Sequence, residues 1–247
     1  MQVYNDLSYG EHEAQKLDLY LPEQAEAMFV YFHGGGLNQG DKDGSQYFAP
    51  YLAERKIAVV TANYRMYPDA HYPDFIEDAA LAVAWARQYM KEHLGCDRLY
   101  VGGSSAGGYL SMMLCFDKRY LTAAGVDPSV VTGYFHDAGQ PTAHFNVLKY
   151  DRGVDSKRVI IDETAPLYYV GLEKSYPPMR FIVSDQDIRG RYEQTMLMLS
   201  ALSDFHYSDF DHAVMHGKHC EYWNQADENG ESRLGKMILD FIRSLEK

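Results

Sequence analysis

Short runs of apolar, β-forming residues alternate with segments of helical periodicity along most of the chain. The apolar runs occupy residues 16–21, 28–32, 57–62, 99–102, 130–135 and 179–183. Strands that alternate with helices in this way build a mainly parallel sheet that is covered by helices on both faces. We therefore predict an α/β fold with a mainly parallel central sheet.

The clearest helical pattern runs from about Phe75 to Glu92, where apolar residues recur at steps of three and four. Two further helices are expected over residues 192–202 and 232–245, and a strand over residues 206–210. The interval 133–172 fits neither period and is rich in aromatic side chains. We expect a small cap or long loop there, at about 134–172.

The length of 247 residues, with no repeat, low-complexity tract or linker, predicts a single domain over residues 1–247. The 35 acidic side chains exceed the 23 basic ones, for a formal net charge of −12. A surface of this charge repels a polyanion. Nucleic acid is therefore not an expected partner, and nothing in the sequence indicates the oligomeric state.

The segment after Met1 has neither the basic nor the apolar part of a secretory leader, and no later stretch approaches the ~18 apolar residues of a membrane helix. The three cysteines are widely spaced and odd in number, which favours a reducing compartment over a disulfide framework. We predict a cytoplasmic protein without a membrane partner.

A candidate nucleophile lies between the apolar run 99–102 and a predicted helix. Gly103-Ser104-Ser105-Ala106-Gly107 matches the G-x-S-x-G pattern of a nucleophile elbow, a sharp strand-to-helix turn with the serine at its tip. Side chains at the two glycine positions would collide with neighbouring backbone. We predict that Ser105 is the nucleophile, whereas Ser104 packs or forms hydrogen bonds locally.

A glycine loop, His33-Gly34-Gly35-Gly36, follows the run 28–32. Such a loop brings backbone N–H groups to the oxyanion of an acyl-transfer intermediate. We assign the oxyanion hole to the N–H groups of Gly35, Gly36 and Ala106, with Gly34 as a substitute for one of them. His33 is expected to orient the loop. The pattern of a phosphate-binding loop is absent.

Enzymes with this elbow carry their acid and then their histidine after the serine. The run 179–183 ends in Ser184-Asp185-Gln186-Asp187, and we favour Asp187 as the acid, with Asp185 second. Three histidines follow residue 210 as candidate bases. We favour His219, which follows Gly217 where a helix is expected to begin, over His216 and then His212. No metal is predicted, because no second ligand pair accompanies the His216–Cys220 segment.

Together these motifs resemble the hormone-sensitive-lipase-like and acetyl-esterase branch of the α/β hydrolases. The resemblance also rests on the segment Asn63-Tyr64-Arg65-Met66-Tyr67-Pro68, on Tyr72-Pro73 and on Pro177-Pro178 before a strand. It implies the α/β-hydrolase fold, with Ser105, Asp187 and His219 as catalytic triad and no cofactor. Ser184 stands where the family usually has glycine, and the N-terminal segment is too short for the helical cap of larger lipases, so a compact acyl pocket is implied.

We therefore expect a serine carboxylesterase that hydrolyses small-molecule esters, with an acetyl or small aromatic acyl group and in some cases a sugar, through an acyl-enzyme. An arylformamidase-like amide hydrolase is the main alternative, and an inactive binding module is a third. The aromatic residues of the interval 133–172 either wall the substrate pocket or belong to the core. The residues concerned are Tyr134, Phe135, His144, Phe145, Tyr150, Tyr168 and Tyr169.

Overall fold

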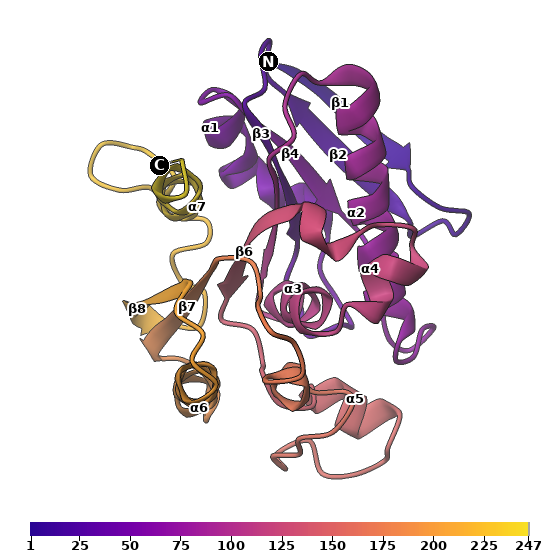
Figure 1. Ribbon diagram of the computed structural model, residues 1–247, viewed down its shortest axis with the longest axis vertical. Coiled ribbons are helices and arrows are strands. Elements are labelled where there is room, and N and C mark those ends of the chain that lie inside the picture. Colours follow the sequence, from indigo (N-terminus) through magenta and orange to yellow (C-terminus); the bar gives the residue numbers. More distant parts are fainter. Residues whose placement is uncertain (247) are drawn as a thin grey trace.

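The computed structural model describes residues 1–246, and its strands form one eight-stranded sheet in the order β1-β2-β4-β3-β5-β6-β7-β8 (Figure 1). β1 and β2 join the sheet antiparallel, whereas the pairs from β4 to β8 are parallel. The strands are β1 (Gln2–Ser8), β2 (Lys16–Leu21), β3 (Ala27–Phe32), β4 (Ile57–Ala62), β5 (Leu99–Ser104), β6 (Val131–Asp137), β7 (Met179–Gln186) and β8 (Phe210–Lys218).

Helices cover both faces of this sheet (Figure 1). One face packs against α2 (Asp74–His93), α3 (Ala106–Phe116) and α6 (Arg191–Asp204). The other packs against α1 (Ala49–Ala53) and α7 (Arg233–Ser244). The shorter helices are α4 (Arg119–Ala123), α5 (Phe145–Tyr150), η1 (Lys42–Tyr47), η2 (Pro128–Val130) and η3 (Pro166–Tyr169). The mainly parallel α/β fold predicted from the alternating pattern is confirmed.

The central strands read as continuous apolar runs because both of their faces are buried. β3, β4 and β5 are buried at every position. Successive side chains of a strand point to opposite faces, and in β3 Val30 joins the core on the α2 side while Phe29 and Tyr31 join the core on the α7 side. Neighbouring residues of β3 therefore belong to different cores, one on each face of the sheet.

The structure corrects the predicted bounds of the last strand and the helix expected to begin after Gly217, and it adds one strand. The last strand is β8 at residues 210–218 and not 206–210, since His206 adopts a left-handed conformation, with φ of 65°, in the turn that ends α6. No helix begins after Gly217, because residues 219–223 form turns and α7 starts only at Arg233. β1 is an additional strand, and its mostly exposed side chains at the sheet edge provide no apolar pattern.

The interval expected as a cap at 134–172 is shorter, because β6 continues through Asp137. Residues 138–172 then form loops around α5 and η3. Asp151, just after α5, holds this segment to the body through hydrogen bonds with Tyr67, His71 and Tyr72. Of the aromatic residues considered for a pocket wall, Tyr134, Phe135 and His144 are buried in the interior, and Tyr150 and Tyr168 are exposed.

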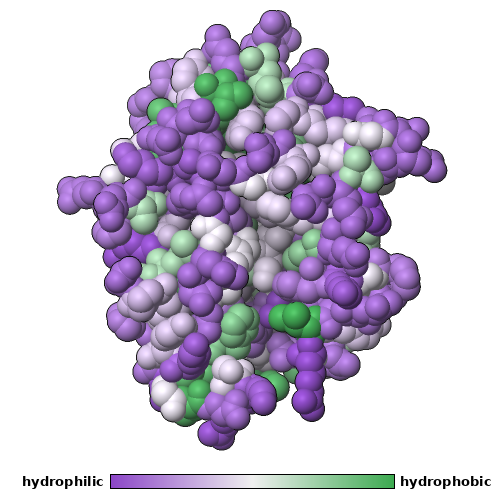
Figure 2. Space-filling view, turned by 180° about the vertical axis from the view of Figure 1, so that it is seen from behind, coloured by the Kyte–Doolittle hydropathy of each residue, from purple (hydrophilic) through white to green (hydrophobic). Residues whose placement is uncertain are grey.

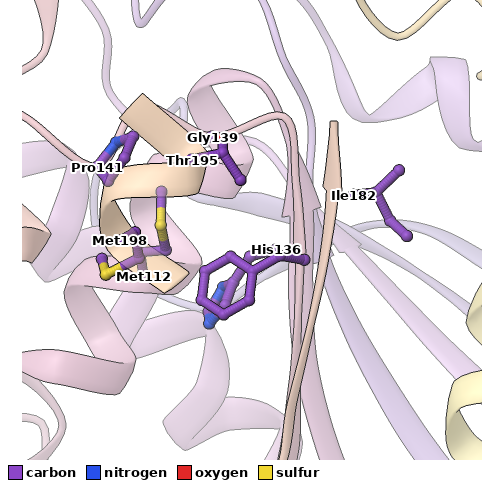
Figure 3. A pocket seen from close by; sticks show the side chains of 8 residues that line it. Met112, His136, Gly139, Pro141, Ile182, Thr195 and Met198 are labelled. Carbon is purple, nitrogen blue, oxygen red and sulfur yellow. The ribbon is translucent and has the colours of Figure 1, made fainter. Parts of the chain in front are cut away.

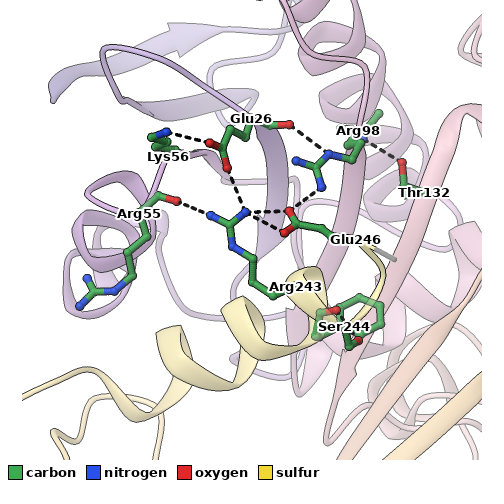
Figure 4. Close-up of polar contacts among 10 residues, drawn as sticks. Glu26, Arg55, Lys56, Arg98, Thr132, Arg243, Ser244 and Glu246 are labelled. Carbon is green, nitrogen blue, oxygen red and sulfur yellow. Dashed lines mark hydrogen bonds and ion pairs between the residues drawn. The ribbon is translucent and has the colours of Figure 1, made fainter.

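A charged network ties the C-terminal helix to the sheet (Figure 4). Arg243 of α7 donates to Glu26 and Glu246, at 2.9 and 2.8 Å, and Arg98 also pairs with Glu246. Lys56 donates to Glu26 at 2.8 Å. Because these groups are largely exposed, the network orients α7 more than it stabilises the fold.

The face shown in Figure 2 is mostly hydrophilic, and its hydrophobic residues form separate spots. Such scattered apolar residues are normal on a protein surface. Among residues 1–246, no helix combines the length and apolar character needed to cross a bilayer.

Candidate active site

Ser105 lies at a sharp turn between β5 and α3. Its φ of 56° and ψ of −111° fall outside the conformations that residues with side chains ordinarily adopt. The turn is held by the Ser105 backbone N–H, which donates to the Asp137 carbonyl at 2.7 Å. A Cβ at Gly107 would lie 1.9 Å from the Phe32 carbonyl oxygen, and one at Gly103 2.5 Å from the Gly107 backbone. These contacts explain both glycines of the motif.

Three side chains from separate loops form a hydrogen-bonded chain at the carboxyl edge of the sheet. His219 Nε2 lies 2.8 Å from Ser105 Oγ, and His219 Nδ1 lies 2.6 Å from Asp187 Oδ1. Asp187 follows β7, and His219 follows the neighbouring β8. The sheet therefore brings together three predicted residues that are up to 114 positions apart.

The Asp187 carboxylate has 0% exposure and is surrounded by donors. Besides His219, it accepts the backbone N–H groups of Ser184 and Ile188, at 3.2 and 2.8 Å. Burial raises the pKa of Asp187, but the hydrogen bond and charge of His219 and the backbone donors outweigh burial, so its pKa lies below the ordinary value. The group thus stays an anion that fixes the orientation of the imidazole.

The alternative acid and base pair with each other at the surface. His216 Nδ1 lies 2.7 Å from Asp185 Oδ2, and their side chains are 85% and 41% exposed. His212 and His216 both belong to β8, and both are exposed. The hydrogen bond to Ser105 comes from His219 alone among the three candidate bases in the described part of the chain.

The predicted oxyanion loop lies directly beside the serine. A Cβ at Gly34 would lie 3.2 Å from the Cβ of Ser105, and one at Gly35, whose φ is 113°, would lie 1.9 Å from the Gln39 carbonyl oxygen. Glycine at these positions thus lets the loop turn tightly and lie close to Ser105. The Asn146 side-chain amide donates to the Gly36 carbonyl at 2.5 Å and so ties the loop to α5.

His33 lies behind the oxyanion loop, as expected for a residue that orients it. Its ring is buried, stacks on Tyr64 with 4.5 Å between centroids, and has Nδ1 2.6 Å from the Gly34 carbonyl oxygen. Burial lowers its pKa. A neutral His33 supports the loop without moving protons.

A buried polar cluster beneath Ser105 is one that sequence reasoning missed. Ser104 and Tyr222 donate to Asp137, Tyr31 donates to Ser104 at 2.8 Å, and Trp223 donates to Tyr31 at 3.0 Å. Burial raises the pKa of Asp137 to about 6 although both hydroxyl donors lower it. The position of Asp137 at a strand end was a usable signal, whereas Tyr222 and Trp223 belong to no motif.

A cavity of about 380 Å³ opens over the serine. The oxyanion loop, Ser105, His219, Cys220 and Trp223 line it. Its size suits a small organic group. Among residues 1–246, no group of three or more side chains that commonly bind metals comes together.

Sequence comparisons find relatives that match less than half of this chain. The family model described as BD-FAE matches residues 17–132. Esterase LipI of Mycobacterium tuberculosis is 40% identical over 102 residues, which make up 40% of this chain and 32% of LipI. Kynurenine formamidase of Danio rerio is 32% identical over 116 residues, 46% of this chain and 39% of that protein. The matches cover well under half of these relatives' own lengths.

Structural comparison extends over nearly the whole chain. The crystal structure of Esterase B from Lactobacillus rhamnosis superposes with a TM-score of 0.77 at 18% identity, covering 99% of this chain and 85% of the esterase. At that identity the likeness concerns the fold. It confirms the α/β-hydrolase architecture predicted from the sequence.

Proposed function

We propose that this chain is a serine carboxylesterase that hydrolyses small acyl esters, in keeping with its similarity to esterases and with its resemblance to the hormone-sensitive-lipase-like and acetyl-esterase branch of the α/β hydrolases. The observation that carries this proposal is the hydrogen-bonded chain from Ser105 through His219 to Asp187, with distances of 2.8 and 2.6 Å. A nucleophile, a base and an orienting acid at these separations suit acyl transfer.

In the proposed mechanism, His219 Nε2 takes the proton of Ser105 as its Oγ attacks the ester carbonyl. The backbone N–H groups of Gly35, Gly36 and Ala106 would stabilise the resulting oxyanion, each by about 3 kcal/mol. His219 then returns the proton to the departing alcohol. Water, activated by the same imidazole, releases the acid from the acyl-enzyme.

Asp187 would hold the proton of His219 on Nδ1, so that Nε2 is free to accept the serine proton. It also stabilises the imidazolium that forms at each transfer. The anionic state of Asp187 supports this role, because the pKa of its carboxyl lies below the ordinary value.

The dimensions of the site support small acyl groups. The cavity over Ser105 has a volume of about 380 Å³ and ends at Trp223 and the oxyanion loop. An acetyl, propionyl or single aromatic acyl group fits such a space.

The three cysteines are free thiols, which supports the prediction that the protein acts in a reducing compartment such as the cytoplasm.

A second candidate is hydrolysis of an arylformamide, because the kynurenine formamidase of Danio rerio is among the relatives. The same nucleophile, base and oxyanion donors cleave an activated amide. We propose it as the alternative, because the other relative described above is named an esterase.

The test compares initial rates with p-nitrophenyl esters from acetate to octanoate and with N-formylkynurenine, for the wild type and for Ser105→Ala. We expect the highest kcat/KM for the shortest esters, and about a million-fold loss of turnover in Ser105→Ala with an unchanged circular dichroism spectrum. Near-normal ester hydrolysis by the variant would refute the mechanism. A preference for N-formylkynurenine would favour the formamidase.

A further inference from the structure

A second cavity, of about 700 Å³, lies between the segment after α5 and the loop that joins β7 to α6. Four cationic side chains line it: Lys157, Arg158, Arg189 and Arg191. The protein as a whole carries a net charge of −12. A cavity with four cations and no carboxylate in its lining is therefore opposite in sign to the rest of the molecule.

None of these cations is in direct contact with a carboxylate among the described residues. The ion pairs formed within residues 1–246 include none of the four, although the nearby Arg152 pairs with Asp162 at 2.7 Å and with Glu163 at 3.3 Å. The carboxylate of Asp155 accepts the backbone N–H of Lys157. Four like charges around one cavity repel each other, so a bound anion stabilises the arrangement.

Arg191 is the most unusual of the four, since only 3% of its surface is exposed. Its guanidinium donates to two neutral oxygens, the carbonyl of Ala138 and Oε1 of Gln140. Burial lowers its pKa to about 10, despite the nearby charge of Asp187, so it remains a cation at neutral pH. A buried charge without a bonded carboxylate costs free energy, and a positive cavity for a ligand accounts for its presence.

The cavity adjoins the candidate active site. Phe145 lines it and also contacts the oxyanion loop, since a Cβ at Gly36 would lie 3.2 Å from the Phe145 ring. On the opposite side, Ile188 and Arg189 line it directly after Asp187. Phe145, Val159 and Ile188 add an apolar surface to the lining of this cavity, against which a carbon chain or ring can pack.

We propose that this cationic cavity binds a carboxylate at the far end of the ester substrate, so that the preferred substrates are anionic esters. The inference rests on the esterase proposed above and adds a substrate class to it. Lys157, Arg158 and Arg189 hold the carboxylate through charge-assisted hydrogen bonds. Arg191 is a positioning residue that sets the Ala138–Gln140 loop and adds to the positive potential.

The test uses two matched ester pairs, because the carboxylate can belong to either side of the scissile bond. The pair 4-acetoxybenzoate and methyl 4-acetoxybenzoate places or removes the charge on the alcohol side. The pair mono-4-nitrophenyl adipate and 4-nitrophenyl hexanoate does so on the acyl side. We expect wild-type kcat/KM to favour the anionic member of one pair, with a preference that falls when NaCl is raised to about 0.5 M.

The decisive variant is Lys157→Gln/Arg158→Gln, which leaves the loop of Asp187 untouched. We expect its preference for the anionic ester to fall about tenfold, as the loss of two partly exposed charge contacts implies. Lys174→Gln removes an exposed cation that lines another cavity, and should keep the wild-type preference. An unchanged preference in the double variant, or none in the wild type, would overturn the proposal.

If no ester is hydrolysed, the proposed esterase function fails, and the cavity is then judged by binding. Calorimetric titration with 4-hydroxybenzoate measures this without turnover. Binding to the wild type that is weakened about tenfold in the double variant would support the anion site. Equal binding by both proteins, or no binding, would reject it.

Discussion

The backbone of Ser105 shows how one residue depends on its neighbours. Its positive φ is unfavourable for any side chain, and it persists because the Asp137 carbonyl, the Gly107 backbone and the start of α3 determine the turn. Strain of this kind concentrates at functional sites. Here it directs the serine hydroxyl out of the sheet edge toward His219.

His219 and His216 provide a matched comparison, because His219 lies within hydrogen-bonding distance of Ser105 whereas His216 pairs with Asp185 at the surface. We expect His219→Gln to lower kcat for a p-nitrophenyl ester by at least about 10⁴-fold, because the serine loses its base. His216→Gln removes an exposed imidazole that pairs with Asp185 and should change kcat less than twofold, a negligible ~0.4 kcal/mol. Steady-state kinetics of both variants decides this. The reverse ranking would move the base to His216.

β3 and α3 approach each other closely at Gly107. Gly107 of α3 lies against the last residue of β3, with no room for a methyl group beside the Phe32 carbonyl. This contact lets the helix begin directly after Ser105, the proposed nucleophile. It places the positive end of α3, with the Ala106 N–H, at the site proposed for the oxyanion.

Gly107→Ala should therefore destabilise the protein by at least about 2 kcal/mol, since backbone must shift to admit the Cβ. Urea unfolding measures the loss. Gly95→Ala is the control, because a Cβ at Gly95 meets nothing within 4 Å. A Gly107→Ala protein as stable as this control would contradict the packing argument.

The layer between β6, β7 and α6 contains a buried histidine (Figure 3). His136 of β6 lies beside Phe181, Met112 and Met198, and burial lowers its pKa to about 3. The unfolded chain binds a proton at this residue near pH 6.5. Between about pH 6.5 and 3 only the unfolded state is protonated there, so stability falls as pH falls, by up to ~1.4 kcal/mol per unit.

His136→Phe removes this dependence. We expect the difference in unfolding free energy, wild type minus variant, to become less favourable to the wild type as the pH drops from about 7.5 to 5, by ~1 kcal/mol or more. Asp137, whose pKa is raised to about 6, has the opposite slope, but it is present in both proteins and cancels. Urea unfolding at several pH values is the measurement, and a constant difference would refute the assignment.

The whole molecule consists of two cores on either side of one sheet, and α7 closes the second of them. Phe241 of α7 is 2% exposed and contacts the rings of Tyr100 and Phe135, with centroids 6.1 Å away in each case. The last helix of the chain thus covers strands from its middle. The apolar side of α7 holds the helix on the sheet, and the surface ion pairs of Arg243 contribute less to stability.

Phe241→Ala should cost about 3–5 kcal/mol, because it leaves a large cavity in the second core. The control Leu172→Ala truncates a side chain that is 68% exposed and should change stability by less than about 0.5 kcal/mol. Chemical denaturation of both variants tests this. A small loss for Phe241→Ala would show that α7 packs loosely.

The sequence alone determined the class of fold and singled out Ser105 as the candidate nucleophile. Apolar periodicity is a local signal, and it identified the six strands β2 to β7 and the long helix α2. The elbow and the glycine loop could also be predicted from the sequence. Glycine is needed where one backbone segment approaches another closely, and the glycines of each motif lie within a few residues of one another. Strand β1 and nearly all of β8 escaped this reasoning, because both strands are largely exposed and neither has an apolar run of its own.

Only the tertiary structure decided which acid and which histidine meet Ser105. Asp185 and Asp187 are two positions apart, and residues with this spacing point to the same side of a regular strand. The sequence could therefore favour one of them as the acid but could not show which one lies beside the histidine. The irregular end of β7 buries Asp187 beneath His219 and leaves Asp185 at the surface with His216. The buried cluster around Asp137 and the cationic cavity are likewise unreadable in sequence, since their members come from distant segments and gather only when the sheet edge forms.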